Sequence, residues 1–108
     1  MLNSTVLVGR LVNDPELYET DNGRKVTRIT LAVPRSYKNM NGEYDTDFIG
    51  CKLWQNVAQS TTEYCRKGDL LGVKGSIQTS SYETEEGMKY ITEVVADKVT
   101  FLSHKNKD

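Results

Sequence analysis

Apolar and polar residues alternate along most of this chain, and glycine, asparagine and aspartate interrupt the alternation at short intervals. A period of two is typical of β-strands, whose side chains point to opposite faces in turn. The pattern therefore predicts a small all-β domain. The expected strands cover residues 6–12, 26–33, 48–54, 70–79 and 88–102.

Turn-forming residues indicate where these strands end. Residues 13–15, with the sequence Asn-Asp-Pro, follow the first strand, and residues 21–23, Asp-Asn-Gly, are expected to form a turn before the second. Pro34 is expected to end the second strand, because proline has no N–H to donate to a β-ladder. Residues 34–47 then form a long polar loop, and such loops are often functional. The acidic segment 83–87 is expected to form the tip of the last hairpin.

One stretch, residues 55–67, has the spacing of a short helix, with Gly68 as its expected C-terminal cap. The predicted order is therefore three strands, one helix and two strands. A helix between strands three and four fits a five-stranded OB-fold barrel better than a β-sandwich.

Length and charge limit the possible functions. The chain has 108 residues, enough for one domain with its own core. Its formal net charge is −1, so the whole chain is not the strongly basic body expected of a simple nucleic-acid coat protein. No apolar run approaches the ~18 residues of a membrane helix, and the N-terminus does not resemble a signal peptide. We expect a cytoplasmic protein without membrane contact.

Residue types that support catalysis or metal binding are sparse. Cys51 and Cys65 form no Cys-x-x-Cys pair, and His104 is the single histidine, so no disulfide framework or zinc site is expected. Both cysteines are interpreted as small buried hydrophobic residues. The acidic clusters 45–47 and 83–86 lie in polar segments, and there is no phosphate-binding loop or dinucleotide fingerprint. We expect no enzymatic activity, no cofactor and no metal.

The segment 48–54 is the most informative stretch. Its odd positions are apolar and form the expected core face, whereas its even positions carry Phe48, Lys52 and Trp54, with Gly50 leaving a gap between them. Aromatic rings interleaved with cations are how proteins stack bases while neutralising phosphates. The alternative is that both faces are buried, under the helix or a partner subunit, and that the rings belong to a core.

Further cations, rings and hydrogen-bonding groups fall on the outward parity of other expected strands or on loops. Each of them alone is typical of a solvated charge or a half-buried ring, so the prediction depends on their convergence. The candidate nucleic-acid-binding residues are Arg28, Arg35, Tyr37, Lys38, Phe48, Lys52, Trp54, Lys74, Gln78 and Tyr82.

Several stretches, taken together and in their order along the chain, carry a family resemblance. They are residues 1–3, 6–11, 14–17, 29–33, 47–49, 66–69, 75–79 and 92–97. With these stretches the sequence resembles the family of bacterial single-stranded DNA-binding proteins. The resemblance implies a homotetramer of OB domains, associated with the nucleoid, that wraps single-stranded DNA in replication, recombination and repair. It also implies base stacking at four positions, which carry Tyr37, Phe48, Trp54 and Tyr82 here.

The sequence departs from the family pattern in three places, one of which is that Tyr37 and Tyr82 stand where some relatives have tryptophan, a larger stacking surface. Ser76 and the serines at 80 and 81 stand where relatives often have basic residues, which predicts weaker phosphate contact along that edge. The expected domain covers residues 1–103, and 104–108 form a polar stub in place of the linker and acidic tip through which the family recruits partners. We therefore expect no recruitment of that kind.

A second function remains open beside DNA binding. The near-neutral charge and the serines favour an OB-fold protein-interaction module with weak DNA binding, such as a replication-restart or phage-encoded relative. The four rings, with Lys52 and Lys74, favour sequence-tolerant binding of single-stranded DNA.

Overall fold

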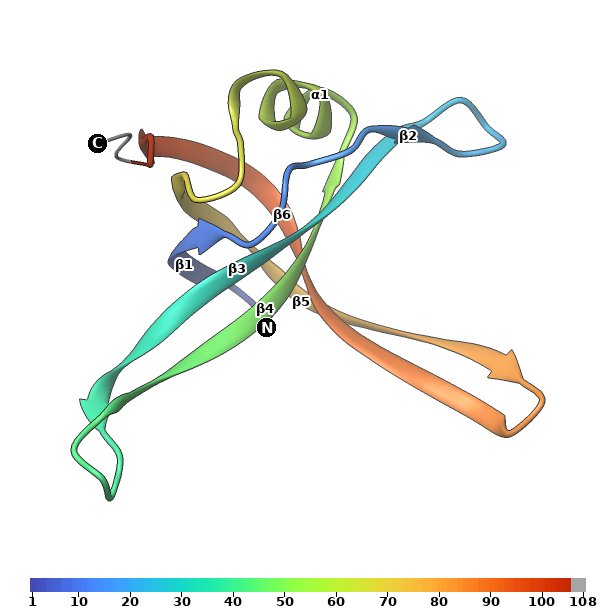
Figure 1. The fold of residues 1–108 in the computed structure, drawn as a ribbon. Helices are drawn as coiled ribbons and strands as arrows, with labels where there is room; N and C mark the ends of the chain where they lie inside the picture. The colour runs from blue at the N-terminus through green and yellow to red at the C-terminus, as the bar shows by residue number, and fades with distance from the viewer. Residues whose placement is uncertain (106–108) are drawn as a thin grey trace.

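Strands make up most of the computed structural model, which describes residues 1–105. The elements are β1 (Thr5–Leu11), β2 (Tyr18–Glu19), β3 (Lys25–Lys38), β4 (Tyr44–Trp54), α1 (Gln55–Tyr64), β5 (Leu70–Thr84) and β6 (Gly87–Ser103). β1 pairs with both β3 and β5, so the five long strands close into a barrel, and β2 adds a short strand beside β3 (Figure 1). The predicted all-β, five-stranded OB-type barrel with one helix is confirmed.

The register of the strands fixes which residues share a face. Neighbouring strands are antiparallel except β4 and β6, which run parallel with Cys51 opposite Val94. Arg10 of β1 pairs with Ala32 of β3 and closes the barrel. Parallel neighbours require a long crossover, and here α1 and β5 together supply it.

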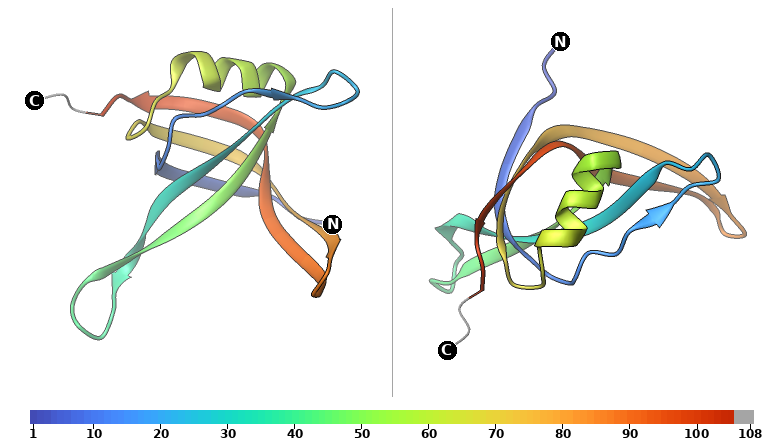
Figure 2. Two further views of the ribbon diagram at one scale, coloured as in Figure 1. Left: turned by 45° about the vertical axis from the view of Figure 1, so that its right-hand side comes forward. Right: turned by 90° about the horizontal axis from the view of Figure 1, so that it is seen from above.

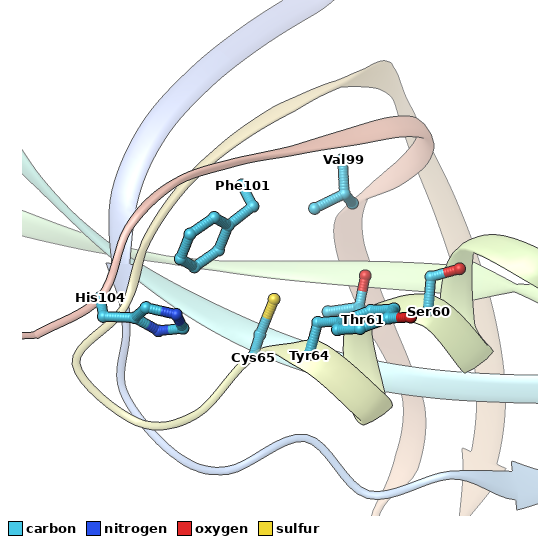
Figure 3. A pocket seen from close by; sticks show the side chains of 7 residues that line it. All are labelled: Ser60, Thr61, Tyr64, Cys65, Val99, Phe101 and His104. Carbon is cyan, nitrogen blue, oxygen red and sulfur yellow. The ribbon is translucent and has the colours of Figure 1, made fainter.

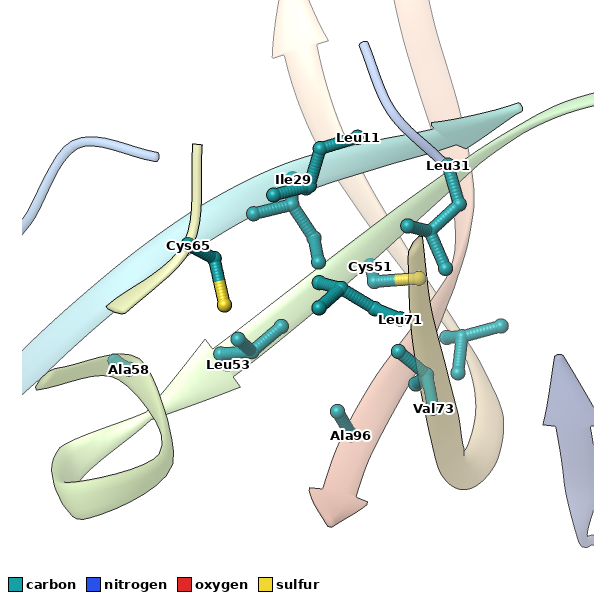
Figure 4. Packing of buried hydrophobic residues seen from close by; sticks show 11 residues of the cluster. Leu11, Ile29, Leu31, Cys51, Leu53, Ala58, Cys65, Leu71, Val73 and Ala96 are labelled. Atoms are coloured by element: carbon teal, nitrogen blue, oxygen red, sulfur yellow. The ribbon is translucent and has the colours of Figure 1, made fainter. Parts of the chain in front are cut away.

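Alternate residues of the strands fill the barrel, as Figure 4 shows. Leu31, Cys51, Leu53 and Leu71 are fully buried. Burying one such aliphatic side chain contributes roughly 1.5–3 kcal/mol, so this cluster is the main source of stability. Cys51 and Cys65 are both free and buried, as predicted, and burial together with the nearby Glu93 raises the pKa of Cys51 to about 11.

The helix α1 lies across one end of the barrel (Figure 2) and buries Ala58 and Thr61. The expected extent of 55–67 is wrong, because the helix ends at Tyr64 and Cys65 is already extended. Leaving the helix there lets the Cys65 side chain join the core. Among residues 1–105, no helix has the length and apolar character that crossing a bilayer requires.

Gly68 is not the helix cap that the sequence suggested. It lies in the turn between α1 and β5, with φ of 93°, a conformation that glycine adopts readily. Asp69 holds this turn, since its buried carboxylate accepts hydrogen bonds from the backbone N–H groups of Arg66 and Lys105 at 2.9 and 3.1 Å. Lys105 belongs to the expected polar stub, of which residues 106–108 lie outside the described residues.

The segment 34–47 is a loop only at residues 39–43. β3 continues through Pro34 to Lys38 and pairs with β4 from Tyr44, so the two strands form a hairpin arm that projects from the barrel (Figure 1). Pro34 is tolerated because β3 pairs with β1 only at residues 31 and 32, and beyond them one edge of β3 carries no partner strand. A second arm, β5–β6, is longer than expected and turns at residues 85 and 86, within the predicted acidic tip.

Gly75 on β5 is required by close backbone packing. A Cβ atom there would lie 2.1 Å from the carbonyl oxygen of Val95, whereas a Cβ at Gly72 on the same strand would meet its nearest atoms at 3.8 Å. We expect Gly75→Ala to lower the free energy of unfolding by about 1–3 kcal/mol, because the neighbouring strand must shift. Gly72→Ala should change it by less than about 0.5 kcal/mol. Chemical unfolding of the two variants checks this, and equal midpoints would contradict it.

Candidate nucleic-acid interface

The outer face of β3 and β4 carries the core of the predicted site. Arg28 lies opposite Lys52, and Val26 opposite Trp54, so their side chains share one face. Phe48 lies further along the same face, and its side chain is 66% exposed. The parity predicted from the sequence is therefore correct for β4, and in this chain the face that carries the rings is not covered by the helix.

The same face is open between the two rings. Gly50 lies between Phe48 and Lys52, and a Cβ built on it would meet no heavy atom within 4 Å. Thr30 is its neighbour across the ladder. A flat group therefore has room to lie against the strand between the two aromatic side chains.

Trp54 is contacted by two cations. The guanidinium carbon of Arg24 lies 4.2 Å from the ring centroid, and Nζ of Lys52 lies 4.6 Å from it. Both distances suit cation–π attraction, and they place positive charge beside the ring. After Trp54 the chain turns sharply, with Gln55 at φ of 54°. Arg24 was not among the predicted residues, because only the turn at 21–23 brings it over the ring.

Arg28 has a carboxylate partner on β6. Its Nε lies 3.4 Å from Oε2 of Glu93, whose side chain is only 11% exposed. Glu93 lies opposite Gln78 in the β5–β6 ladder, so Gln78 is beside this ion pair. The alternation of the strands indicated Arg28 and Gln78 as candidates but gave no sign of the acidic residue between them.

Arg35, Tyr37 and Lys38 lie on the β3–β4 arm rather than on a loop. Arg35 donates two hydrogen bonds to Asp47, at 3.0 and 2.9 Å, and these bonds hold the pKa of Asp47 below its ordinary value. Tyr37 is exposed, and Nζ of Lys38 lies 5.8 Å from the ring centroid of Tyr44. Tyr44 is a further exposed ring that the sequence analysis missed.

Two candidates lie away from this face. Tyr82 is half exposed on the β5–β6 arm, opposite Lys89 in the ladder. The two arms project in different directions (Figures 1 and 2), so Tyr37 and Tyr82 do not form one cluster within this chain. Lys74 pairs with Val6 of β1 and Lys98 of β6, on the side of the barrel where β1, β5 and β6 meet.

An apolar pocket of about 420 Å³ lies between the end of α1 and the end of β6. Tyr64, Cys65, Phe101 and His104 are among its lining residues (Figure 3), and none of the predicted binding residues is among them. Burial raises the pKa of Cys65, which keeps its thiol protonated and unreactive. Within residues 1–105, no group of His, Cys, Asp and Glu side chains could hold a metal ion.

The chain is similar to known proteins over nearly its whole length. The model of the Single-strand binding protein family matches residues 2–102. "Single-stranded DNA-binding protein B" of Bacillus subtilis is 50% identical over 109 residues, which cover 100% of this chain and 96% of the relative. "Single-stranded DNA-binding protein 1" of Staphylococcus aureus is 49% identical, with 100% of this chain and 70% of the relative covered. A match of this extent and identity shows that the chain belongs to the Single-strand binding protein family.

Proposed function

We propose that this chain binds single-stranded DNA with little sequence preference, and that it does so in replication, recombination and repair. The observation that carries the proposal is the open outer face of β3 and β4, where Phe48, Lys52 and Trp54 lie beside Arg28. The relatives from Bacillus subtilis and Staphylococcus aureus, which bear the name of single-stranded DNA-binding proteins, support it.

Stacking on Phe48 and Trp54 is the proposed source of affinity for bases. Every base has a π-face, so rings of this kind bind DNA without reading its sequence. The open space at Gly50 leaves room for a base between the two rings, and Lys52, which contacts Trp54, would meet the phosphate that follows. Tyr37 and Tyr82 would continue the contact on the two arms.

Phosphate contacts are assigned to the cations on and beside this face. Lys52 forms no ion pair within residues 1–105, whereas Arg28 and Arg35 must exchange a carboxylate for a phosphate. Lys38 and Lys74 extend the contact away from the centre, and Gln78 offers a neutral hydrogen-bonding group. The proposed role is binding rather than catalysis. We expect the protein to act in the cytoplasm, at the chromosome.

We also propose that the domain, residues 1–103, assembles into a homotetramer. Val6 and Val8 on the outer face of β1 are 70% and 49% exposed, which is costly on a strand that remains in water. β1 pairs with β3 only at residues 10 and 11, so one edge of β1 at 5–9 has no partner strand within residues 1–105.

Val6→Glu tests the proposed assembly. We expect sedimentation equilibrium to give the mass of four chains for the native protein and a smaller mass for the variant, because a carboxylate would be buried at the contact. Ile77→Glu, at an apolar residue that is also 50% exposed but lies on β5, serves as a control for added charge. A native protein that sediments as a single chain would contradict the proposal.

The alternative of a protein-interaction module has one observation in its favour. Two of the candidate cations, Arg28 on the face and Arg35 on the β3–β4 arm, are paired with carboxylates of the same chain, which weakens the field that attracts DNA. The fluorescence of Trp54, the single tryptophan, distinguishes the two functions. A protein-interaction module with weak DNA binding would show little quenching of this fluorescence on addition of oligo(dT).

Trp54→Ala is expected to weaken binding of oligo(dT) by about 1–3 kcal/mol, the usual contribution of one stacked base. Anisotropy of labelled oligo(dT) measures the loss, and quenching of the native tryptophan provides an independent measurement of stacking. Tyr64→Ala is the matched control, since Tyr64 is an exposed ring on α1 and lies away from the face. Native affinity in a folded Trp54→Ala variant would remove Trp54 from the site.

Asp47→Asn is expected to strengthen binding, because it releases Arg35 for a phosphate. One additional phosphate contact steepens the dependence of log affinity on log salt by about 0.7 for single strands. Asp45→Asn removes the same charge from the same arm, but its carboxylate lies 4.0 Å from Arg35 and makes no hydrogen bond to it. A salt titration of both variants is the test. Equal effects would mean that total charge matters and that the Arg35–Asp47 pair does not.

A further inference from the structure

A second concave surface lies at the end of the barrel where β1 meets the turn before β5. It has a volume of about 470 Å³, and its lining includes Arg10, Lys67, Gly68 and Lys105. None of these residues was predicted to bind DNA. We call this concave surface the groove, and Ala32 is also among its lining residues.

The cations of this groove are held in place around Gly68. Nη1 of Arg10 donates a hydrogen bond of 3.0 Å to the carbonyl oxygen of Gly68. The side chain of Lys105 packs against the same glycine so closely that a Cβ there would lie 2.5 Å from its Cδ atom. The backbone N–H of Lys105 donates to Asp69, and Lys67 directly precedes Gly68. Three chain segments that are far apart in sequence therefore bring their positive charges to one place.

These charges are not neutralised locally. Among residues 1–105, no carboxylate oxygen lies within 4.0 Å of the charged nitrogens of Arg10, Lys67 or Lys105. The two nearby acids are engaged by backbone groups, since Asp14 accepts the N–H of Lys67 at 2.7 Å and Asp69 is buried. This end of the barrel thus differs from the centre of the β3–β4 face, where Arg28 is paired with Glu93.

The groove is continuous with the proposed binding face. Arg10 lies opposite Ala32, and Ala32 lies opposite Phe48 on its other side, so the three side chains form a row across β1, β3 and β4. Neighbouring strands are about 4.8 Å apart, which places Arg10 roughly 10 Å from Phe48 across a small alanine. A strand of DNA stacked on Phe48 meets no bulky side chain in this row before it reaches the groove.

We propose that single-stranded DNA leaving Phe48 crosses Ala32 and lays its backbone in this groove, where Arg10, Lys67 and Lys105 contact phosphates. The inference rests on the proposed function, since it extends the same bound strand. Cations that form no ion pair within residues 1–105 favour a polyanion, and the continuous row favours DNA over an acidic peptide as the occupant. Only a strand long enough to extend beyond Phe48 would reach the groove, so the number of phosphate contacts would depend on the length of the DNA.

The test compares short and long oligo(dT) on the full chain. A strand of about 6 nucleotides covers only the stacking face, whereas about 16 nucleotides, near the upper site size of one OB-fold, reaches the groove. In the double variant Lys67→Gln, Lys105→Gln, the slope of log affinity against log salt should fall by about 1.4 for the long strand. The slope for the short strand should not change. The charge-conserving control, Lys67→Arg with Lys105→Arg, should keep both native slopes.

Three other results would overturn the inference. Unchanged slopes for both lengths would show that the lysines do not contact phosphates, and equal losses for both would show only long-range attraction. Competition by oligo-glutamate at the groove, without a change in the slope for DNA, would assign it to an acidic peptide instead. Failure of the native chain to bind the short strand would contradict the proposed function itself, so the two failures are distinguishable. The single variants, each with a native melting temperature, replace the double variant if it does not fold.

Discussion

The interior of a closed barrel takes up only one face of each strand, and this constraint produces the proposed binding surface. Because Cys51 and Leu53 fill the interior, the residues between and beside them on β4 must point outward. Those positions hold Phe48, Lys52 and Trp54, and β3 places Arg28 opposite Lys52. The packing that stabilises the fold is thus also what presents rings and cations to solvent on one surface.

The distribution of charge matters more than its sum. The net charge of −1 does not show where the charges lie or which arginines are paired with acids. Glu93 and Asp47 hold Arg28 and Arg35, so on these two side chains a phosphate must compete with a carboxylate. The cations around Gly68 carry no such partner among residues 1–105. Such a chain can be nearly neutral and still offer a polyanion a continuous set of contacts.

The sequence alone predicted the fold class, the position of the helix and the outward parity of β4. These features depend on local alternation and on turn residues, both of which are visible in the sequence. It failed at Pro34 and at the end of α1. Pro34 is compatible with a strand only because one edge of β3 has no partner there, and the helix ends early so that Cys65 can enter the core.

Contacts between distant segments account for the other residues that the sequence did not reveal. Arg24 meets Trp54 through a turn, and Glu93 meets Arg28 through the register of β6. Arg10 and Lys105 come together only because both pack on Gly68. In the sequence each of them is one charged residue among many, and only the three-dimensional structure shows what it contacts.

Chemical-shift mapping by proton–nitrogen correlation NMR tests the central claim most directly. On titration with oligo(dT), the account predicts that the largest changes fall on the indole N–H of Trp54 and on the backbone amides of β3 and β4. Changes confined to the pocket lined by Tyr64 and Phe101, with the indole N–H unaffected, would place the DNA elsewhere and contradict the account.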